Sequence, residues 1–149
     1  IIGVAPNDIH FQKMSIIKEE FEKRGIAADL QRNIDYETDG WKDTYSHGND
    51  LVVLALARFP QRPFGAMNFM SPEFFSLWGC LCHGRQKTVV VSFGNPYHLH
   101  EHFEASKIYI NAYSFVDQCM QAFVRALFGE IPFLGKSPVN LKIDHVFNF

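Results

Sequence analysis

The sequence predicts an α/β fold, a three-layer α/β/α sandwich around a flavodoxin-like, five-stranded, mostly parallel sheet. The clearest sign is two apolar runs, 51–57 and 88–93, because strands this apolar are typical of a parallel sheet with helices on both faces. Helix-like segments alternate with such runs, and right-handed crossovers then place helices on both sides of the sheet. The strand order 2-1-3-4-5 fits five strands with one reversal beside the first.

The strands are predicted from apolar or β-branched runs that end at glycine, proline or asparagine. The second run is the weakest, and we expect it near the edge of the sheet. The segment 58–70 has no period and contains two prolines, so a long loop is predicted after the third strand. The five strands are expected at residues 1–5, 26–30, 51–57, 88–93 and 108–113.

The helices have recognisable start and stop signals. Asn7 or Asp8 can cap the first helix, and Gly25 ends it. Ser114 can cap the last helix, which Gly129 ends in the position where a left-handed residue is favoured. The other helices are expected within 33–49 and 71–84.

The composition is that of one folded domain. The chain has 149 residues, of which 47% are hydrophobic and 20% charged, so it can bury a core. A net charge of -2 and a pI of about 6.4 exclude the electrostatic footprint of a nucleic-acid or anionic-membrane binder. No run approaches the roughly 20 apolar residues that span a bilayer.

Phenylalanine is frequent, with fifteen in the chain. Either the core is rich in aromatic residues, or part of them lie on a surface that meets another domain. We expect several of those outside the periodic core pattern to be exposed on the chain alone. These are Phe59, Phe64, Phe69, Phe133, Phe147 and Phe149.

The sequence contains no motif for a cofactor, and we expect no metal site. It has no phosphate-binding glycine pattern and no nucleophile elbow. His98, His100 and His102 resemble a ligand cluster, but on a helix only the outer two share a face, so we favour a surface turn. The three cysteines are an odd number in a chain of this size, which argues against a disulfide framework.

Candidate site residues are predicted from the points where the strands end. In an open parallel sheet the functional loops gather at the carboxyl ends of the strands. Arg58 is the preferred candidate, because it leaves the most central strand and offers a planar fork of donors. The alternative is structural: Asp8 caps a helix, Asn95 shapes a turn and Arg58 pairs with an acid. The candidates are Asn7, Asp8, Arg58, Arg62, Asn95, Tyr97 and Tyr113.

Three segments, 89–97, 113–114 and 126–139, resemble the C-terminal domain of glycoside hydrolase family 3. The most similar branch is that of the bacterial β-N-acetylglucosaminidases, or β-hexosaminidases. The last segment is the most distinctive, although Ser137 stands where a leucine is expected in that branch. The specific resemblance covers about the last third of the chain, and the pattern of strands and helices extends it over the whole.

This resemblance implies that residues 1–149 are a single C-terminal sandwich domain, preceded in the same polypeptide by a (β/α)₈ barrel that binds the carbohydrate. In the family the barrel carries the aspartate nucleophile of a retaining mechanism. The β-glucosidase branch takes its acid/base glutamate from the loop after the third sandwich strand. Here that loop, 58–70, contains no Asp or Glu. The chain alone is therefore expected to be inactive, and no cofactor is implied.

Two classes of function are compatible with the sequence. The first is an accessory domain of a β-N-acetylglucosaminidase-like glycoside hydrolase, with the candidate residues facing the sugar site. The second is a stand-alone flavodoxin-like ligand-binding or regulatory module, and fold analogy alone does not separate the two. Because the chain begins inside an expected strand, we expect it to be part of a longer polypeptide. The sequence does not indicate whether the protein is cytoplasmic or exported from a bacterium.

Overall fold

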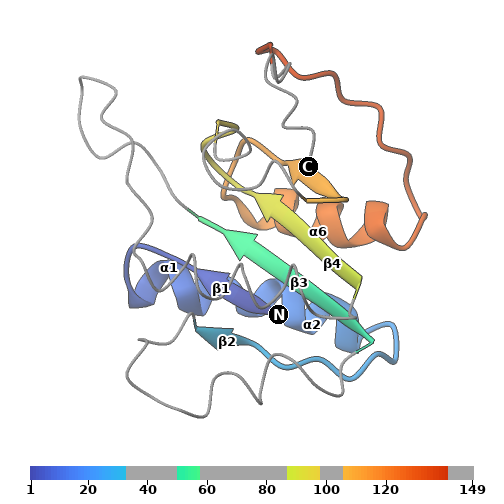
Figure 1. The fold of residues 1–149 in the computed structure, drawn as a ribbon. Coiled ribbons are helices and arrows are strands. Elements are labelled where there is room, and N and C mark those ends of the chain that lie inside the picture. Colours follow the sequence, from blue (N-terminus) through green and yellow to red (C-terminus); the bar gives the residue numbers. More distant parts are fainter. Residues whose placement is uncertain (33–49, 58–86, 98–105, 141–149) are drawn as a thin grey trace, which may run out of the picture.

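The computed structural model describes residues 1–32, 50–57, 87–97 and 106–140, which form a parallel sheet with helices packed against it (Figure 1). The sheet has five strands in the order β2-β1-β3-β4-β5, and every pair is parallel, which confirms the predicted fold class and order. The strands are β1 Ile2–Val4, β2 Gln31–Arg32, β3 Leu51–Leu56, β4 Lys87–Ser92 and β5 Tyr109–Asn111.

Strand β2 lies later in the chain than the sequence predicts. We expected it at 26–30, but Gln31–Arg32 forms the pairing with the first two residues of β1. The segment 26–30 connects a helix to the sheet instead, and Ile26 within it is exposed. An edge strand is positioned by its hydrogen bonds to one neighbour, so burial leaves little apolar pattern in its sequence.

The first predicted helix is divided into two, α1 Asp8–Lys13 and α2 Ser15–Glu22. At the division, the amide of Met14 donates to the carbonyl of Phe11, and the amide of Ile17 donates to that of Met14. These bonds span three residues where an α-helix spans four, which tightens the backbone between the two helices. The division leaves the side chains of Met14 and Ile17 fully buried.

Most predicted helix ends are confirmed. The side chain of Asn7 caps α1 by accepting from the amide of His10 at 3.0 Å. Gly25, after α2, has a φ of 75°, and Gly129, after the last helix, has a φ of 72°. Both are left-handed backbone positions, where glycine has no Cβ to clash.

The start of the last helix differs from the prediction. Helix α6 spans Asp117–Leu127, so it begins after Val116 and not after Ser114. Val116 makes no side-chain capping bond, and Asp117 supplies a negative charge to the first turn. Asp117 also forms an ion pair with Lys13 at the end of α1, at 2.9 Å. The first turn of α6 therefore contacts another helix, where the sequence predicted a local cap.

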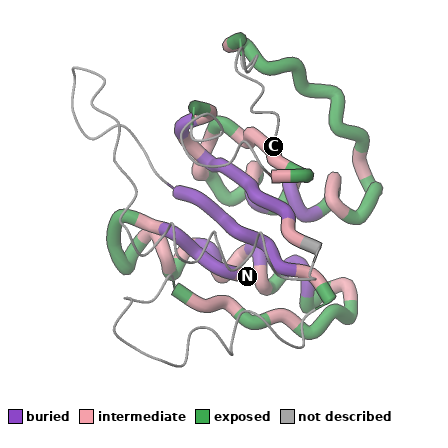
Figure 2. Tube along the Cα trace, in the orientation of Figure 1, coloured by how far each residue is buried: buried purple, intermediate pink, exposed green. Residues whose placement is uncertain are grey.

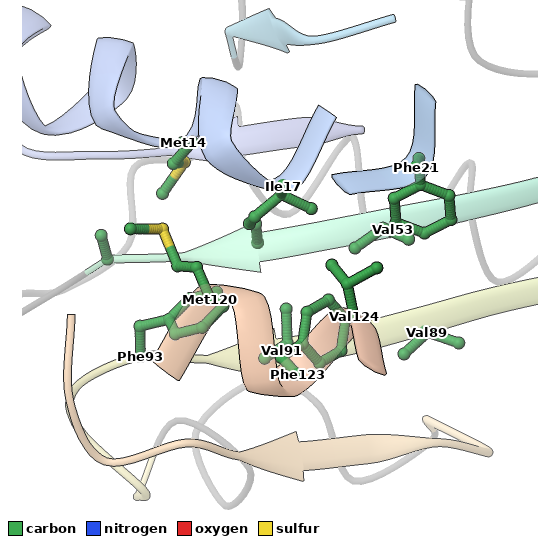
Figure 3. Packing of buried hydrophobic residues seen from close by; sticks show 12 residues of the cluster. Met14, Ile17, Phe21, Val53, Val89, Val91, Phe93, Met120, Phe123 and Val124 are labelled. Atoms are coloured by element: carbon green, nitrogen blue, oxygen red, sulfur yellow. The ribbon is translucent and has the colours of Figure 1, made fainter. Parts of the chain in front are cut away.

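One hydrophobic core lies between the sheet and the helices α2 and α6 (Figure 3). Alternate residues of β3 and β4 point into it, as the two-residue period of a strand requires. Met120 of α6 lies near Met14 on one side of this core, and Phe123 packs edge to face on Phe93 with ring centroids 5.9 Å apart. Its buried members are Met14, Ile17, Phe21, Val53, Ala55, Ala57, Val89, Val91, Phe93, Met120, Phe123 and Val124.

The opposite face of the central strands is buried as well. The intervening residues Leu54, Leu56 and Val90 have no exposed surface. Burial on both faces is what the continuous apolar runs predicted. The second helical layer, which we expected at 33–49 and 71–84, lies outside the described residues.

Gly3 sets how closely the helices approach the sheet. A Cβ built on Gly3 would lie 2.8 Å from Sδ of Met14 and 3.0 Å from Cδ2 of Phe11. Met14 is fully buried, and side chains in a protein core are closely packed, so its sulfur can shift only by rearranging its neighbours. A glycine in β1 therefore allows the α1–α2 junction to pack directly on the strand.

We predict that Gly3→Ala lowers the free energy of unfolding by about 1–3 kcal/mol, because the added methyl overpacks the contact with Met14. Urea unfolding followed by circular dichroism measures this change. Gly135→Ala is the matched control, because no atom lies within 4 Å of its added Cβ; its stability should equal the parent's or exceed it by up to ~1 kcal/mol. Equal stability of the two variants would contradict the close approach.

Candidate functional site

The carboxyl edge of the sheet is the candidate site. All five strands end there, and the connections that leave β1, β4 and β5 carry five of the seven predicted site residues (Figure 1). Open α/β sheets bind ligands at this edge, beside the strand where the order reverses. The other two predicted residues, Arg58 and Arg62, lie outside the described residues.

Asn7, after β1, is occupied in capping and in holding a histidine. Its Oδ1 accepts from the backbone amide of His10 at 3.0 Å and lies 2.6 Å from the Nδ1 atom of the same residue. Because Oδ1 is an acceptor, Nδ1 of His10 carries a proton. The His10 ring stacks on Phe115, which follows β5, with centroids 5.7 Å apart. These contacts join the loop after β1 to the loop after β5.

Three further contacts fix α1 at this edge. Asp8 in its first turn forms an ion pair with Arg32, the last residue of β2. Arg32 also lies over the ring of Phe11, with Cζ 5.7 Å from the centroid. At the other end of α1, Nζ of Lys13 lies 5.6 Å from the ring centroid of Phe115. Asp8 is therefore held in a structural ion pair.

Asn95, after β4, shapes the turn that carries Tyr97. Its Oδ1 accepts from the amide of Tyr97 at 3.0 Å, and its carbonyl accepts from the Ser92 hydroxyl at 2.8 Å. Asn95 itself is buried, at 9% exposure, whereas Tyr97 is exposed. The turn thus places an aromatic side chain in solvent at the carboxyl edge.

Tyr113, after β5, has an unusual backbone and a distant partner. Its φ is 59°, a left-handed conformation that is costly for a residue with a bulky side chain. Its hydroxyl lies 2.6 Å from Oγ of Ser137. Because the Ser137 hydroxyl already donates to the carbonyl of Val139 at 2.7 Å, Tyr113 is the donor in this bond.

The structure thus separates the predicted candidates by role. Asn7, Asp8 and Asn95 make capping, ion-pair and turn contacts, which is the structural alternative raised by the sequence. Tyr97 and Tyr113 present exposed rings at the same edge, and contact with a ligand stays a prediction for them.

Sequence reasoning missed the cluster of His10, Lys13, Phe115 and Asp117, which joins the two loops. The sequence contains a local signal for the contact between Asn7 and His10, because His10 lies three residues after the capping Asn7. The contacts to the β5–α6 segment had no such signal, because their partners are about a hundred residues apart.

Among the described side chains, the shifted pKa values lie at the opposite end of α2 and α6. Hydrogen bonds from Lys23 and then Arg24 lower the pKa of the Glu20 carboxyl, and hydrogen bonds from Arg24 lower that of Glu130. The same two carboxylates, Glu130 first, raise the pKa of Arg24 above its ordinary value. Arg24 follows α2 and Glu130 follows α6, so this network ties the two helix ends together. It is an ion-pair network that lies away from the candidate edge.

Among the described residues, no three histidine, cysteine or acidic side chains are grouped so that they could hold a metal ion. The histidine cluster at 98–102 lies outside those residues. In the same part of the chain, no helix is long and apolar enough to cross a membrane. The described edge offers aromatic surface and hydrogen-bonding groups, and its two named carboxylates, Asp8 and Asp117, are both ion-paired.

The fold is similar to part of a known enzyme. Comparisons with protein families and with curated proteins found no match. Among solved structures, the chain is similar to a fungal multi-domain GH3 β-N-acetylglucosaminidase that has a GCN5-related glucosamine N-acetyltransferase region. The TM-score is 0.59 at 20% sequence identity, over 87% of this chain and 14% of that one. At this identity the likeness shows the fold, and this chain spans a small part of that enzyme's length.

We predict that Glu130→Gln lowers the melting temperature at pH 7, because it removes the carboxylate that pairs with Arg24. A carboxyl whose folded pKa is lowered stabilises the fold above its unfolded pKa of about 4.3, and this contribution is lost as the pH falls further. The gap between variant and parent should therefore narrow below about pH 4. Melting curves from pH 7 to pH 3 measure it.

Glu22→Gln is the matched control, since Glu22 has a longer, exposed ion pair with Lys18 at 3.7 Å. A pH-independent difference between Glu130→Gln and the parent would show that the carboxylate charge of Glu130 is not what stabilises the fold.

Proposed function

We propose that this chain is an accessory domain of a β-N-acetylglucosaminidase-like glycoside hydrolase of family 3. The observation that carries the proposal is the structural similarity to part of a multi-domain enzyme of this kind, over 87% of the chain. The sequence segments 89–97, 113–114 and 126–139 resemble the same class of enzyme. A sequence resemblance and a structural similarity therefore support one class of protein.

In this proposal the chemistry belongs to a catalytic barrel in the same polypeptide. Retaining hydrolysis of a glycoside needs a nucleophile and a general acid on opposite sides of the bond. The segment 58–70, whose counterpart supplies the acid in a related branch, contains no Asp or Glu. At the described carboxyl edge, Asp8 and Asp117 are held by Arg32 and Lys13. The chain is suited to support a sugar site and not to cleave the bond itself.

A second candidate is a stand-alone ligand-binding or regulatory module. The observation that favours it is the open parallel sheet with exposed Tyr97 and Tyr113 at the edge where such sheets bind ligands. Expression of the complete polypeptide encoded by the gene decides between the two. A barrel-sized domain with β-N-acetylglucosaminidase activity supports the first candidate, and a polypeptide without a further domain supports the second.

We predict that the isolated 149-residue chain releases no aryl group from an aryl β-N-acetylglucosaminide, because it lacks both catalytic groups of the proposed mechanism. A chromogenic substrate assay on the purified chain measures this. Turnover that remains after rigorous removal of contaminating host enzymes would place a catalytic site within the chain and overturn the division of labour between domains.

We also predict a substrate contact for Arg58, which leaves the central strand. In the complete enzyme, Arg58→Ala should lower kcat/KM at least about tenfold, or about 1.4 kcal/mol of transition-state stabilisation. Arg32→Ala is the control, because Arg32 pairs with Asp8 at the end of the edge strand. Unchanged kinetics for Arg58→Ala in a protein of normal stability would contradict the substrate contact and indicate a structural role for Arg58.

A further inference from the structure

The segment after α6, residues 130–140, forms a strap on the outside of the molecule. It has no helix or strand, and it runs from the end of α6 back to the carboxyl end of β5 (Figure 1). Almost its whole length is exposed, as Figure 2 shows. An irregular exposed segment is ordinarily mobile, because holding each residue costs backbone entropy. This strap is held at both ends.

The first end is held by Arg24. Its Nε and Nη2 atoms donate to the two carboxylate oxygens of Glu130 at 2.5 and 2.9 Å, which is a bidentate pair. Arg24 is in turn held by the Glu20 carboxylate through Nη1, at 2.8 Å. Arg24 also lies over the ring of Phe128, with Cζ 5.5 Å from its centroid. The start of the strap is thereby fixed to α2.

The second end is held by Tyr113. Its hydroxyl donates to Ser137, whose Oγ also accepts from the amide of Val139 at 3.3 Å. The Tyr113 backbone is in the left-handed region, at a φ of 59°. Strained backbone persists where the surrounding contacts require it. Here the strained residue is the one that reaches the strap.

Between these ends the strap presents two consecutive apolar side chains to solvent. Phe133 is 60% exposed and Leu134 is 81% exposed. Phe133 belongs to the six phenylalanines of which the sequence predicts several to be exposed, and it is exposed. The other five lie outside the described residues. Pro132 and Pro138 restrict the backbone on either side of the pair. The apolar pair is therefore offered on a stiffened segment with fixed ends.

We propose that the strap 130–140 is a docking element that inserts Phe133 and Leu134 into an apolar pocket on another domain of the same polypeptide. This rests on the proposed function, since the structure that this fold matches is a multi-domain chain of which the match covers 14%. The two held ends remove part of the entropy cost of binding in advance. Adjacent large apolar side chains then supply the buried centre of an interface, with Lys136 and Glu130 at its rim.

The test is thiol labelling at position 134. Leu134→Cys is made in a chain whose three native cysteines are replaced by serine, both as the isolated chain and within the complete polypeptide. The labelling rate with a maleimide depends on the exposure of the thiol. We expect at least about a tenfold slower reaction in the complete polypeptide than in the isolated chain. Glu22→Cys, on the exposed side of α2, is the control and should react at the same rate in both.

A second variant tests the anchor. Tyr113→Phe removes the hydroxyl that donates to Ser137 and leaves the ring in place. Hydrogen exchange of the amides in 131–139 should become faster in the isolated chain, and protection of Leu134→Cys in the complete polypeptide should decrease. Tyr97→Phe, at the same edge, is the matched control and should change neither. Unchanged exchange in Tyr113→Phe would show that the hydrogen bond does not hold the strap.

The outcomes separate the docking strap from the proposed function. Equal labelling of Leu134→Cys in both forms, in a complete polypeptide that hydrolyses a β-N-acetylglucosaminide, overturns the docking strap alone. Protection in a polypeptide without that activity supports the strap and counts against the proposed function. Protection that appears in the isolated chain as its concentration rises, with a dimer in sedimentation equilibrium, would make a second copy the occupant and overturn the proposal. A polypeptide without a further domain contradicts both.

Discussion

Burial of strand β3 on both of its faces is the constraint on which this structure depends. The strand lies between β1 and β4 and pairs with β4 along its whole length, from Leu51 to Leu56. Leu54 and Ala55 point to opposite faces, and neither is exposed. A strand buried on both faces is typical of a parallel sheet whose faces are covered by helices, and here α2 and α6 cover one of the two faces.

That edge holds its polar residues in structural contacts, which bears on function. Asn7, Asp8 and Asn95 stand where open α/β sheets place their sites, yet each is occupied by a cap, an ion pair or a turn. Among the described residues, these three side chains therefore have structural roles. The strap 130–140 carries the exposed apolar pair Phe133 and Leu134 and is held by contacts at both ends. The fold resembles a part, 14% of the length, of a multi-domain GH3 β-N-acetylglucosaminidase, and the proposal of a neighbouring domain rests on this resemblance.

The fold was more predictable than the site. The apolar runs at 51–57 and 88–93 predicted the central strands within a residue at each end, because both faces of those strands are buried and burial marks the sequence. The edge strand β2 and the start of α6 were predicted wrongly. At both places the structure has a contact with a distant element that no local pattern predicts: the pairing of Gln31 with Ile2 and the ion pair of Asp117 with Lys13. For the site, the predicted strand ends placed the candidate residues at the carboxyl edge of the sheet. They did not predict which groups these side chains contact.

The sequence alone determined the α/β class and the glycines that end two helices, since these depend on local periodicity and backbone conformation. The order 2-1-3-4-5 was predicted by analogy with known open sheets, and the structure confirms it. Only the tertiary structure decided that Arg24 holds Glu130 and that Tyr113 holds Ser137. The first pair is 106 residues apart and the second 24. No local pattern specifies such a pair, because it exists only after the crossovers have brought the helix ends and strand ends to common edges.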